Sequence, residues 1–150
     1  MMDLGELEAL YVDRLPVFRR VAAAITGDRE AGRDAVQEAF ATAIRKRRGY
    51  RGDGSLEAWV WRIVVNTSRN ARRRADRRVP VEPDAATDPS ESGVSPRVPL
   101  EALTGRQREV VFLRYFADLS YGEIAGILGI TEGTVGATLS AAHGVLRRAM

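Results

Sequence analysis

The stretch YGEIAGILGITEGTVGATLS, residues 121–140, decides the fold of the C-terminal part of the chain. Ala125 stands where two helices would approach closely, and Gly129 stands at a tight turn where a positive φ is expected. Val135 and Leu139 then return to face the core. This spacing is typical of a helix-turn-helix, whose second helix usually enters the major groove of DNA. A plain helical hairpin is the alternative interpretation.

Further helix signals precede this unit. Thr104 and Gln107 form a capping-box pattern, which predicts a helix start. Ser120 and Glu123 repeat the pattern. The apolar residues between the two boxes predict a core helix, and they include Val110, Val111 and Leu113. Because no alternating strand pattern appears anywhere, the predicted fold class is all-α.

The N-terminal half has helical periodicity as well. Residues 4–25 predict a helix with a kink or a fresh start at Pro16, ended by Gly27. Asp28 is the expected N-cap of a second helix over residues 28–46. Ser55 is expected to cap a third helix. The apolar stripe of that third helix includes Leu56, Trp59, Val60, Ile63 and Val64.

A linker separates the two halves. Residues 79–99 contain five of the six prolines together with several Ser, Asp and Glu residues, and they show no periodicity. The sequence therefore predicts two small helical domains, residues 1–78 and residues 100–150, joined by a flexible linker over residues 79–99. The C-terminal domain is the predicted helix-turn-helix.

Positive charge is concentrated in one segment. The whole chain has a net charge of +3, whereas residues 45–78 carry 12 basic and 3 acidic groups. This segment includes a basic loop at residues 47–54 and an arginine-rich helix end. Such a local excess of basic residues indicates a binding site for a polyanion such as nucleic acid.

Composition excludes several other classes of protein. The chain has no cysteine, so disulfides, thiolate metal sites and cysteine nucleophiles are excluded. No stretch approaches the roughly 20 apolar residues of a membrane span, and residues 1–10 show no signal pattern. No phosphate-cradling glycine loop, metal cluster or nucleophile–histidine pair is present, so we expect a cytoplasmic protein that is not an enzyme and needs no cofactor or metal.

Four motifs, in order, resemble the extracytoplasmic-function (ECF) class of RNA polymerase sigma factors. They are DAVQEAF at 34–40, WVWRIVVN at 59–66, LTGRQREV at 103–110 and LSYGEIA at 119–125. The resemblance covers nearly the whole chain except the linker. It implies an alternative sigma factor of the bacterial cytoplasm that binds core RNA polymerase and promoter DNA, and it implies an anti-sigma factor as a further partner.

The resemblance also implies roles for individual residues. Those expected to bind the polymerase are Asp34, Gln37, Glu38 and Phe40. Those expected at the minus-ten element are Tyr50, Arg51, Trp61, Arg62, Asn66, Arg69, Arg72, Arg73 and Arg74. Among these, Tyr50 would stack on a flipped base and the arginines would hold phosphates. Trp61 lies either in the core or along the single-strand path, while Trp59 is expected in the core.

The expected recognition helix departs from the family pattern. The residues expected at the minus-thirty-five element are Thr131, Glu132, Thr134, Thr138 and Arg147. The family commonly has basic side chains on this helix, whereas positions 136–138 here hold Gly, Ala and Thr. Because phosphate and guanine contacts mostly use Arg and Lys, we infer that minus-thirty-five binding is weak, altered or replaced by a protein contact.

Two other functions remain open from the sequence. A sigma mimic that sequesters an anti-sigma factor would explain the depleted recognition helix, but it would not need an arginine-rich segment. A stand-alone helix-turn-helix regulator would explain the C-terminal domain, but it would leave the first 78 residues without a role.

Overall fold

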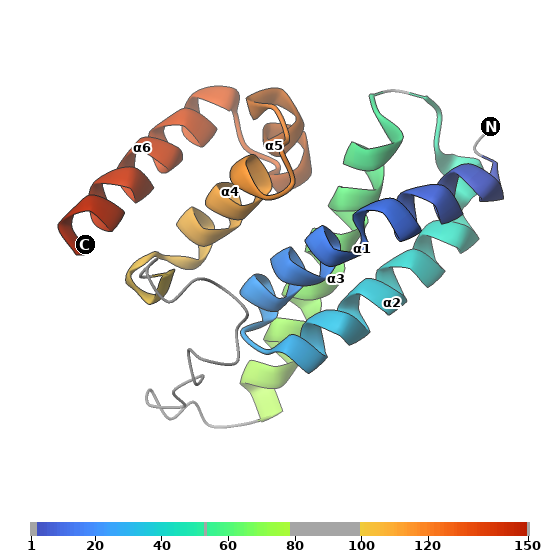
Figure 1. The fold of residues 1–150 in the computed structure, drawn as a ribbon, viewed down its shortest axis with the longest axis horizontal. Helices are drawn as coiled ribbons and strands as arrows, with labels where there is room; N and C mark the ends of the chain where they lie inside the picture. Colours follow the sequence, from blue (N-terminus) through green and yellow to red (C-terminus); the bar gives the residue numbers. More distant parts are fainter. Residues whose placement is uncertain (1–2, 53, 79–99, 150) are drawn as a thin grey trace.

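The computed structural model describes residues 3–52, 54–78 and 100–149, and the regular secondary structure in this part is all helical, with no strand (Figure 1). The elements in order are α1 (Leu4–Thr26), α2 (Arg29–Lys46), η1 (Arg47–Gly49), α3 (Leu56–Arg78), η3 (Leu100–Ala102), α4 (Gly105–Tyr115), α5 (Tyr121–Leu128) and α6 (Glu132–Ala149). The all-α prediction is confirmed. The predicted flexible linker, residues 79–99, lies outside the described residues.

Helices α1, α2 and α3 pack into the N-terminal domain. Its core is built around aromatic rings, because Phe18 meets Phe40 at 5.2 Å and Trp61 at 4.4 Å between ring centroids. Val60 and Val64 of α3 complete this core and are fully buried. Buried side chains of this size each contribute roughly 1.5–3 kcal/mol through removal from water, so the three helices depend on one another for stability.

The predicted helix boundaries agree with the structure. Gly27 ends α1 at φ 83°, and the Asp28 carboxylate caps α2 by accepting a hydrogen bond from the Ala31 N–H at 2.9 Å. Ser55 caps α3 through the Ala58 N–H at 3.0 Å. Pro16 lies inside α1, which continues across it as one helix.

The C-terminal domain consists of α4, α5 and α6. Both predicted capping boxes are present, one at Thr104 and one at Ser120. Gly129 ends α5 at φ 70°, the left-handed conformation expected of the turn glycine. The other positions predicted for the helix-turn-helix are also buried as expected: Ala125, Val135 and Leu139. The helix-turn-helix prediction is therefore confirmed.

The two domains lie against each other along two helix pairs. Helix α1 contacts α4, and α3 contacts α5, as can be followed in Figure 1. On the α1 side the guanidinium of Arg20 stands over the Phe116 ring at 5.1 Å. The N-terminal end of α3 and the helix-turn-helix are thereby brought to one side of the molecule.

Within the described residues, no single helix is long and apolar enough to cross a bilayer. Helices α5 and α6 meet the criteria of length and composition only together, as a pair bent by 101°.

Gly32 is required where α1 and α2 cross. A Cβ atom at Gly32 would lie 2.6 Å from the backbone nitrogen of Ala23 and 2.8 Å from its Cα. Backbone atoms of α1 cannot shift without moving the whole helix, so we expect Gly32→Ala to lower the free energy of unfolding by about 2–3 kcal/mol through overpacking. The gain in helix propensity offsets only about 1 kcal/mol. Thermal unfolding should show a melting temperature several degrees lower than that of the wild type.

Gly144→Ala is the matched control. It makes the same change inside α6, where a Cβ would meet only the flexible end of Arg148 at 3.7 Å. This variant should be neutral or slightly stabilising. Equal melting temperatures for the two variants would contradict the close approach at Gly32.

Candidate nucleic-acid interface

Helix α2 presents a polar face to solvent. Asp34, Gln37 and Glu38 are exposed, while Ala35 and Ala39 beside them in the sequence are buried. This is the arrangement expected of the polymerase-binding helix. Glu38 also forms an ion pair with Arg74 of α3 at 3.7 Å, so the α2 face is continuous with the arginine-rich end of α3.

Phe40 does not share this face. Its side chain is 5% exposed and makes edge-to-face contacts with the rings of Tyr11 and Phe18. The expectation that Phe40 contacts a partner is wrong for this arrangement, because the helical repeat turns position 40 into the three-helix core. Phe40 instead anchors α2 to α1.

A cleft of about 250 Å³ lies between α2 and α3. Asn66 and Arg74, both singled out from the sequence, line it. The sequence did not identify Thr42, Lys46, Ile63, Thr67 and Asn70 as lining residues of a site. Glu38 also lines the cleft, whereas the sequence predicted only a polymerase contact for it. The spacing of four between Asn66, Asn70 and Arg74 places them on one face of α3, and this periodicity was the available signal.

The structure decides between the two positions left open for Trp61. Trp61 is fully buried, and its Nε1 donates to Glu57 Oε2 at 3.2 Å. It therefore lies in the core and does not line a strand path. Trp59 is half-buried instead, and its ring meets that of Tyr50 at 5.6 Å.

The basic loop is ordered around Tyr50. The Tyr50 hydroxyl donates to the Gly54 carbonyl at 2.8 Å, and Gly52 and Gly54 both adopt positive φ. Arg51 is exposed at the edge of the loop. The loop thus offers one aromatic pair, exposed backbone groups and a cation next to the start of α3.

The arginines of α3 divide into two groups. Arg72, Arg73 and Arg74 are exposed, and Arg72 donates to the Ile25 carbonyl at 3.1 Å. Arg62, which is also exposed, and the half-buried Arg69 reach the C-terminal domain. Arg62 Nη2 donates to the Gly126 carbonyl at 2.7 Å, and Arg69 binds the Glu109 carboxylate through two hydrogen bonds. Glu109 was not identified from the sequence, because nothing local marks a contact across 40 residues.

The two threonine side chains at the start of α6 are hydrogen-bonded within the helix start itself. Thr131 Oγ1 accepts from the Thr134 N–H at 3.1 Å, and the two hydroxyl oxygens lie 2.9 Å apart. Glu132 and Thr134 are exposed and Thr138 is half-buried. The Tyr121 ring covers Gly136, because a Cβ there would lie 3.5 Å from it.

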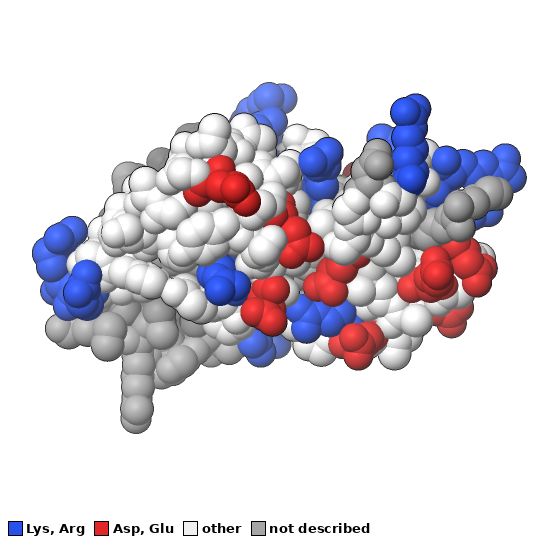
Figure 2. Space-filling view, turned by 90° about the horizontal axis from the view of Figure 1, so that it is seen from above, with Lys and Arg blue, Asp and Glu red and all other residues white. Residues whose placement is uncertain are grey.

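The surface of the C-terminal domain is poor in positive charge. Figure 2 shows a broad white area over the half that carries α4–α6, with blue groups gathered at the left, where α6 ends. Arg147 and Arg148 are exposed at that end. The described residues include no group of three or more His, Asp or Glu side chains that could hold a metal ion.

Both domains match known protein families. Residues 10–78 match Sigma-70 region 2, and residues 100–142 match Sigma-70, region 4. The RNA polymerase sigma-E factor of Streptomyces antibioticus is 30% identical over 152 residues, which cover 97% of this chain and 84% of the relative. The ECF RNA polymerase sigma-E factor of Escherichia coli K12 is 32% identical over 123 residues, which cover 68% of this chain and 64% of the relative.

Solved structures share the fold. The sigma factor RpoE of Bartonella quintana, crystallised with the anti-sigma factor NepR, has a TM-score of 0.79 at 23% identity and covers 97% of this chain and 96% of its own. CnrH in complex with the cytosolic domain of CnrY has a TM-score of 0.73 at 20% identity and covers 97% of this chain and 88% of its own. With matches over both helical domains and in the same order, this chain belongs to the extracytoplasmic-function class of RNA polymerase sigma factors, which direct promoter recognition.

Proposed function

We propose that this sigma factor binds core RNA polymerase through the exposed face of α2 and captures the melted minus-ten strand in the cleft beside it. The polymerase contact would use Asp34, Gln37 and Glu38. The chemistry of RNA synthesis belongs to the polymerase, so the chain acts as an initiation factor and not as an enzyme. We expect it to work in the bacterial cytoplasm, where polymerase and chromosome meet.

The observation that carries the proposal is the α2–α3 cleft. Side-chain amides of Asn66 and Asn70 each offer two donors and an acceptor, which suits the edge of a base. Lys46 contributes a cation that suits a phosphate. The Glu38–Arg74 pair stands at the same cleft, so a strand held there would lie next to the polymerase-binding face.

The basic loop supplies a second element of strand capture. A base extruded from the duplex loses its stacking, at a cost of a few kcal/mol. The Tyr50–Trp59 pair offers an aromatic surface on which such a base could stack, and stacking contributes about 1–3 kcal/mol per base. Arg72, Arg73 and Arg74 would hold phosphates along the exposed side of α3.

The C-terminal domain would make few base-specific contacts with the promoter. The hydroxyl groups of Thr134 and Thr131 are hydrogen-bonded to each other, and the exposed arginines of α6, Arg147 and Arg148, stand at its far end. Arg147 and Arg148 suit phosphate contacts, which position a protein without specifying sequence. The face of α6, which has no Lys or Arg before Arg147, leaves room for a protein contact, such as one with the polymerase.

An anti-sigma factor is the further partner we propose. Of the two similar structures named above, RpoE was crystallised with the anti-sigma factor NepR, and CnrH was solved in complex with the cytosolic domain of CnrY. The sigma-mimic alternative is favoured only by the scarcity of basic residues on α6. It leaves the arginine-rich α3 and its cleft unexplained. A stand-alone regulator would have no use for a region 2 domain.

Transcription in vitro tests the function. Core polymerase would be incubated with fragmented genomic DNA of the source organism, with and without this protein, and RNA 5′ ends would be sequenced. We expect discrete new start sites that share an upstream block. Binding to core polymerase without any new start would favour the sigma mimic.

Single substitutions in the cleft separate strand capture from polymerase binding. Asn70→Ala and Asn66→Ala each improve helix propensity, so loss of activity would not come from unfolding. We expect each to reduce specific transcripts about tenfold, since one lost polar contact to a base costs about 1–3 kcal/mol. Affinity for core polymerase, measured by fluorescence anisotropy, should not change. Glu8→Ala, on the exposed side of α1, is the control and should transcribe as the wild type does.

Footprinting tests the recognition helix. With the holoenzyme on a mapped promoter, we expect protection of the minus-thirty-five block to be weak and sensitive to salt. Thr134→Ala and Thr138→Ala should alter start-site choice less than twofold. A base-specific footprint that either substitution abolishes would show that α6 reads DNA after all.

A further inference from the structure

The outer side of α1 carries a shallow groove along its first half. Gly5, Ala9 and Val12 line the groove together with the acidic residues Glu8 and Asp13, and its volume is about 460 Å³. The spacing of three and four residues places these positions on one face of the helix. The groove therefore follows the helix axis from Gly5 to Asp13, over roughly 12 Å.

This face is not required by the core of the N-terminal domain. All the lining residues are exposed, and Val12 is 70% exposed, whereas Leu7 in the same stretch is buried in the core. Single apolar side chains on a surface are ordinary. Here, however, Gly5 and Ala9 stand beside Val12 with little or no side chain, and the distance between packed helices shrinks where the side chains in contact are small. The groove can therefore admit a second helix at close range.

Pro16 frees a backbone acceptor at a residue that lines the groove. A helical residue at position 16 would donate its N–H to the carbonyl of Val12, but proline has no N–H. Helix α1 nevertheless continues across Pro16 as one helix. Pro16 is exposed, so its ring is not needed to fill the core. The Val12 carbonyl can therefore accept a hydrogen bond from another molecule.

Acidic side chains surround the groove. Residues 1–13 contain four acidic groups and no Arg or Lys, although the whole chain has a net charge of +3. Glu8 and Asp13 take part in none of the ion pairs among the described residues, and the Asp3 carboxylate lies 3.3 Å from the position of a Cβ on Gly5. Figure 2 shows acidic groups gathered at the right-hand end, where α1 begins in Figure 1. This charge attracts a basic partner and disfavours an acidic one such as DNA.

We propose that this face of α1 is a docking site for a basic amphipathic helix of a second protein. The apolar side chains of that helix lie in the groove along Gly5, Ala9 and Val12, as in other complexes in which a helix binds a groove. Its arginines or lysines pair with Glu8 and Asp13, and one of them donates to the Val12 carbonyl. The site lies on a different helix from the one assigned to the polymerase, and it does not depend on that assignment.

A designed pair of peptides probes the site on the full-length protein. The basic peptide is a fluorescein-labelled helix of about 18 residues, with leucines along one face and arginines on either side of them. In the acidic peptide every arginine is replaced by glutamate, so that the length and the apolar face are kept. Fluorescence anisotropy should show binding of the basic peptide only. Its affinity should fall as salt is raised, because salt screens exposed charges.

Val12→Lys is the decisive variant, and Ala141→Lys is its matched control. Both add one positive charge at an exposed helix position, but Ala141 lies on α6. We expect Val12→Lys to weaken binding of the basic peptide roughly tenfold, since it removes the apolar contact and repels the arginines. Ala141→Lys should change the affinity less than about twofold. Because the Val12 side chain is exposed, Val12→Lys should fold normally, and circular dichroism checks this.

Pro16→Ala tests the free carbonyl, because it restores a helical N–H that can donate to the Val12 carbonyl. The substitution should raise the melting temperature of the protein. At the same time it should weaken binding of the basic peptide roughly threefold to fivefold, because the acceptor is then occupied within the helix. A residue that only stabilises the fold would not produce these opposite effects on stability and binding.

Two results would overturn the docking site. One is equal affinity of the basic peptide for the wild type, Val12→Lys and Ala141→Lys. The other is loss of peptide binding once the chain is in complex with core RNA polymerase, which would assign this face of α1 to the polymerase and not to a separate partner. Both measurements use purified components and require no transcription, so failure of the docking site and failure of the sigma function remain distinct.

Discussion

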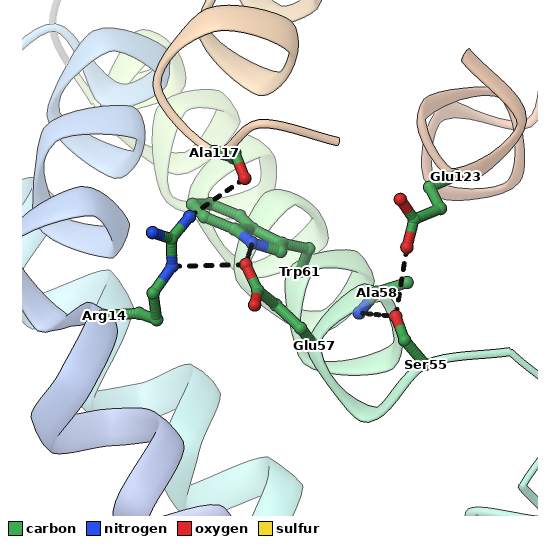
Figure 3. Close-up of polar contacts among 7 residues, drawn as sticks. All are labelled: Arg14, Ser55, Glu57, Ala58, Trp61, Ala117 and Glu123. Carbon is green, nitrogen blue, oxygen red and sulfur yellow. Dashed lines mark hydrogen bonds and ion pairs between the residues drawn. The ribbon is translucent and has the colours of Figure 1, made fainter. Parts of the chain in front are cut away.

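The Glu57 carboxylate connects the core of the N-terminal domain to the contact between the two domains. The fully buried indole of Trp61 needs an acceptor for its N–H, and Glu57, one turn earlier on α3, supplies it at 3.2 Å. The same oxygen pairs with Arg14 at 3.3 Å, and Arg14 donates onward to the Ala117 carbonyl (Figure 3). A single chain of polar contacts therefore runs from the middle of the N-terminal core to the C-terminal domain.

Helix α3 depends on this arrangement for its register. With Trp61 held inward, Val60 and Val64 face the core, and the opposite side of the helix faces solvent. Asn66 and Asn70 then lie in the cleft with α2, while Arg62 and Arg69 lie toward α5 and α4. Rotation of α3 by one residue would bury polar side chains and expose the core, so this packing fixes the position of the proposed strand site.

What the sequence predicted correctly was local. The caps at Asp28, Thr104 and Ser120 and the turn at Gly129 depend on residues within one helical turn, and all were predicted. The sequence placed Trp59 in the core and left Trp61 open between the core and the strand path, because only the packing against α1 decides which of the two is fully buried. Lys46 and Asn70 were missed because their cleft exists only where α2 meets α3. The contact of Arg69 with Glu109 crosses the domains and has no local pattern.

The scarcity of basic residues on α6 is compatible, in electrostatic terms, with the packing of the C-terminal domain against the basic α3. Residues 45–78 carry a net charge of +9, and a strongly basic partner domain would be repelled by them. Residues 100–150 carry five basic and five acidic groups, and two of the acidic ones, Glu109 and Glu123, bind side chains of the N-terminal domain. A neutral helix-turn-helix that lacks basic residues at its reading face is therefore better suited to rest against α3 than a basic one. The low charge of this domain removes a source of repulsion between it and residues 45–78.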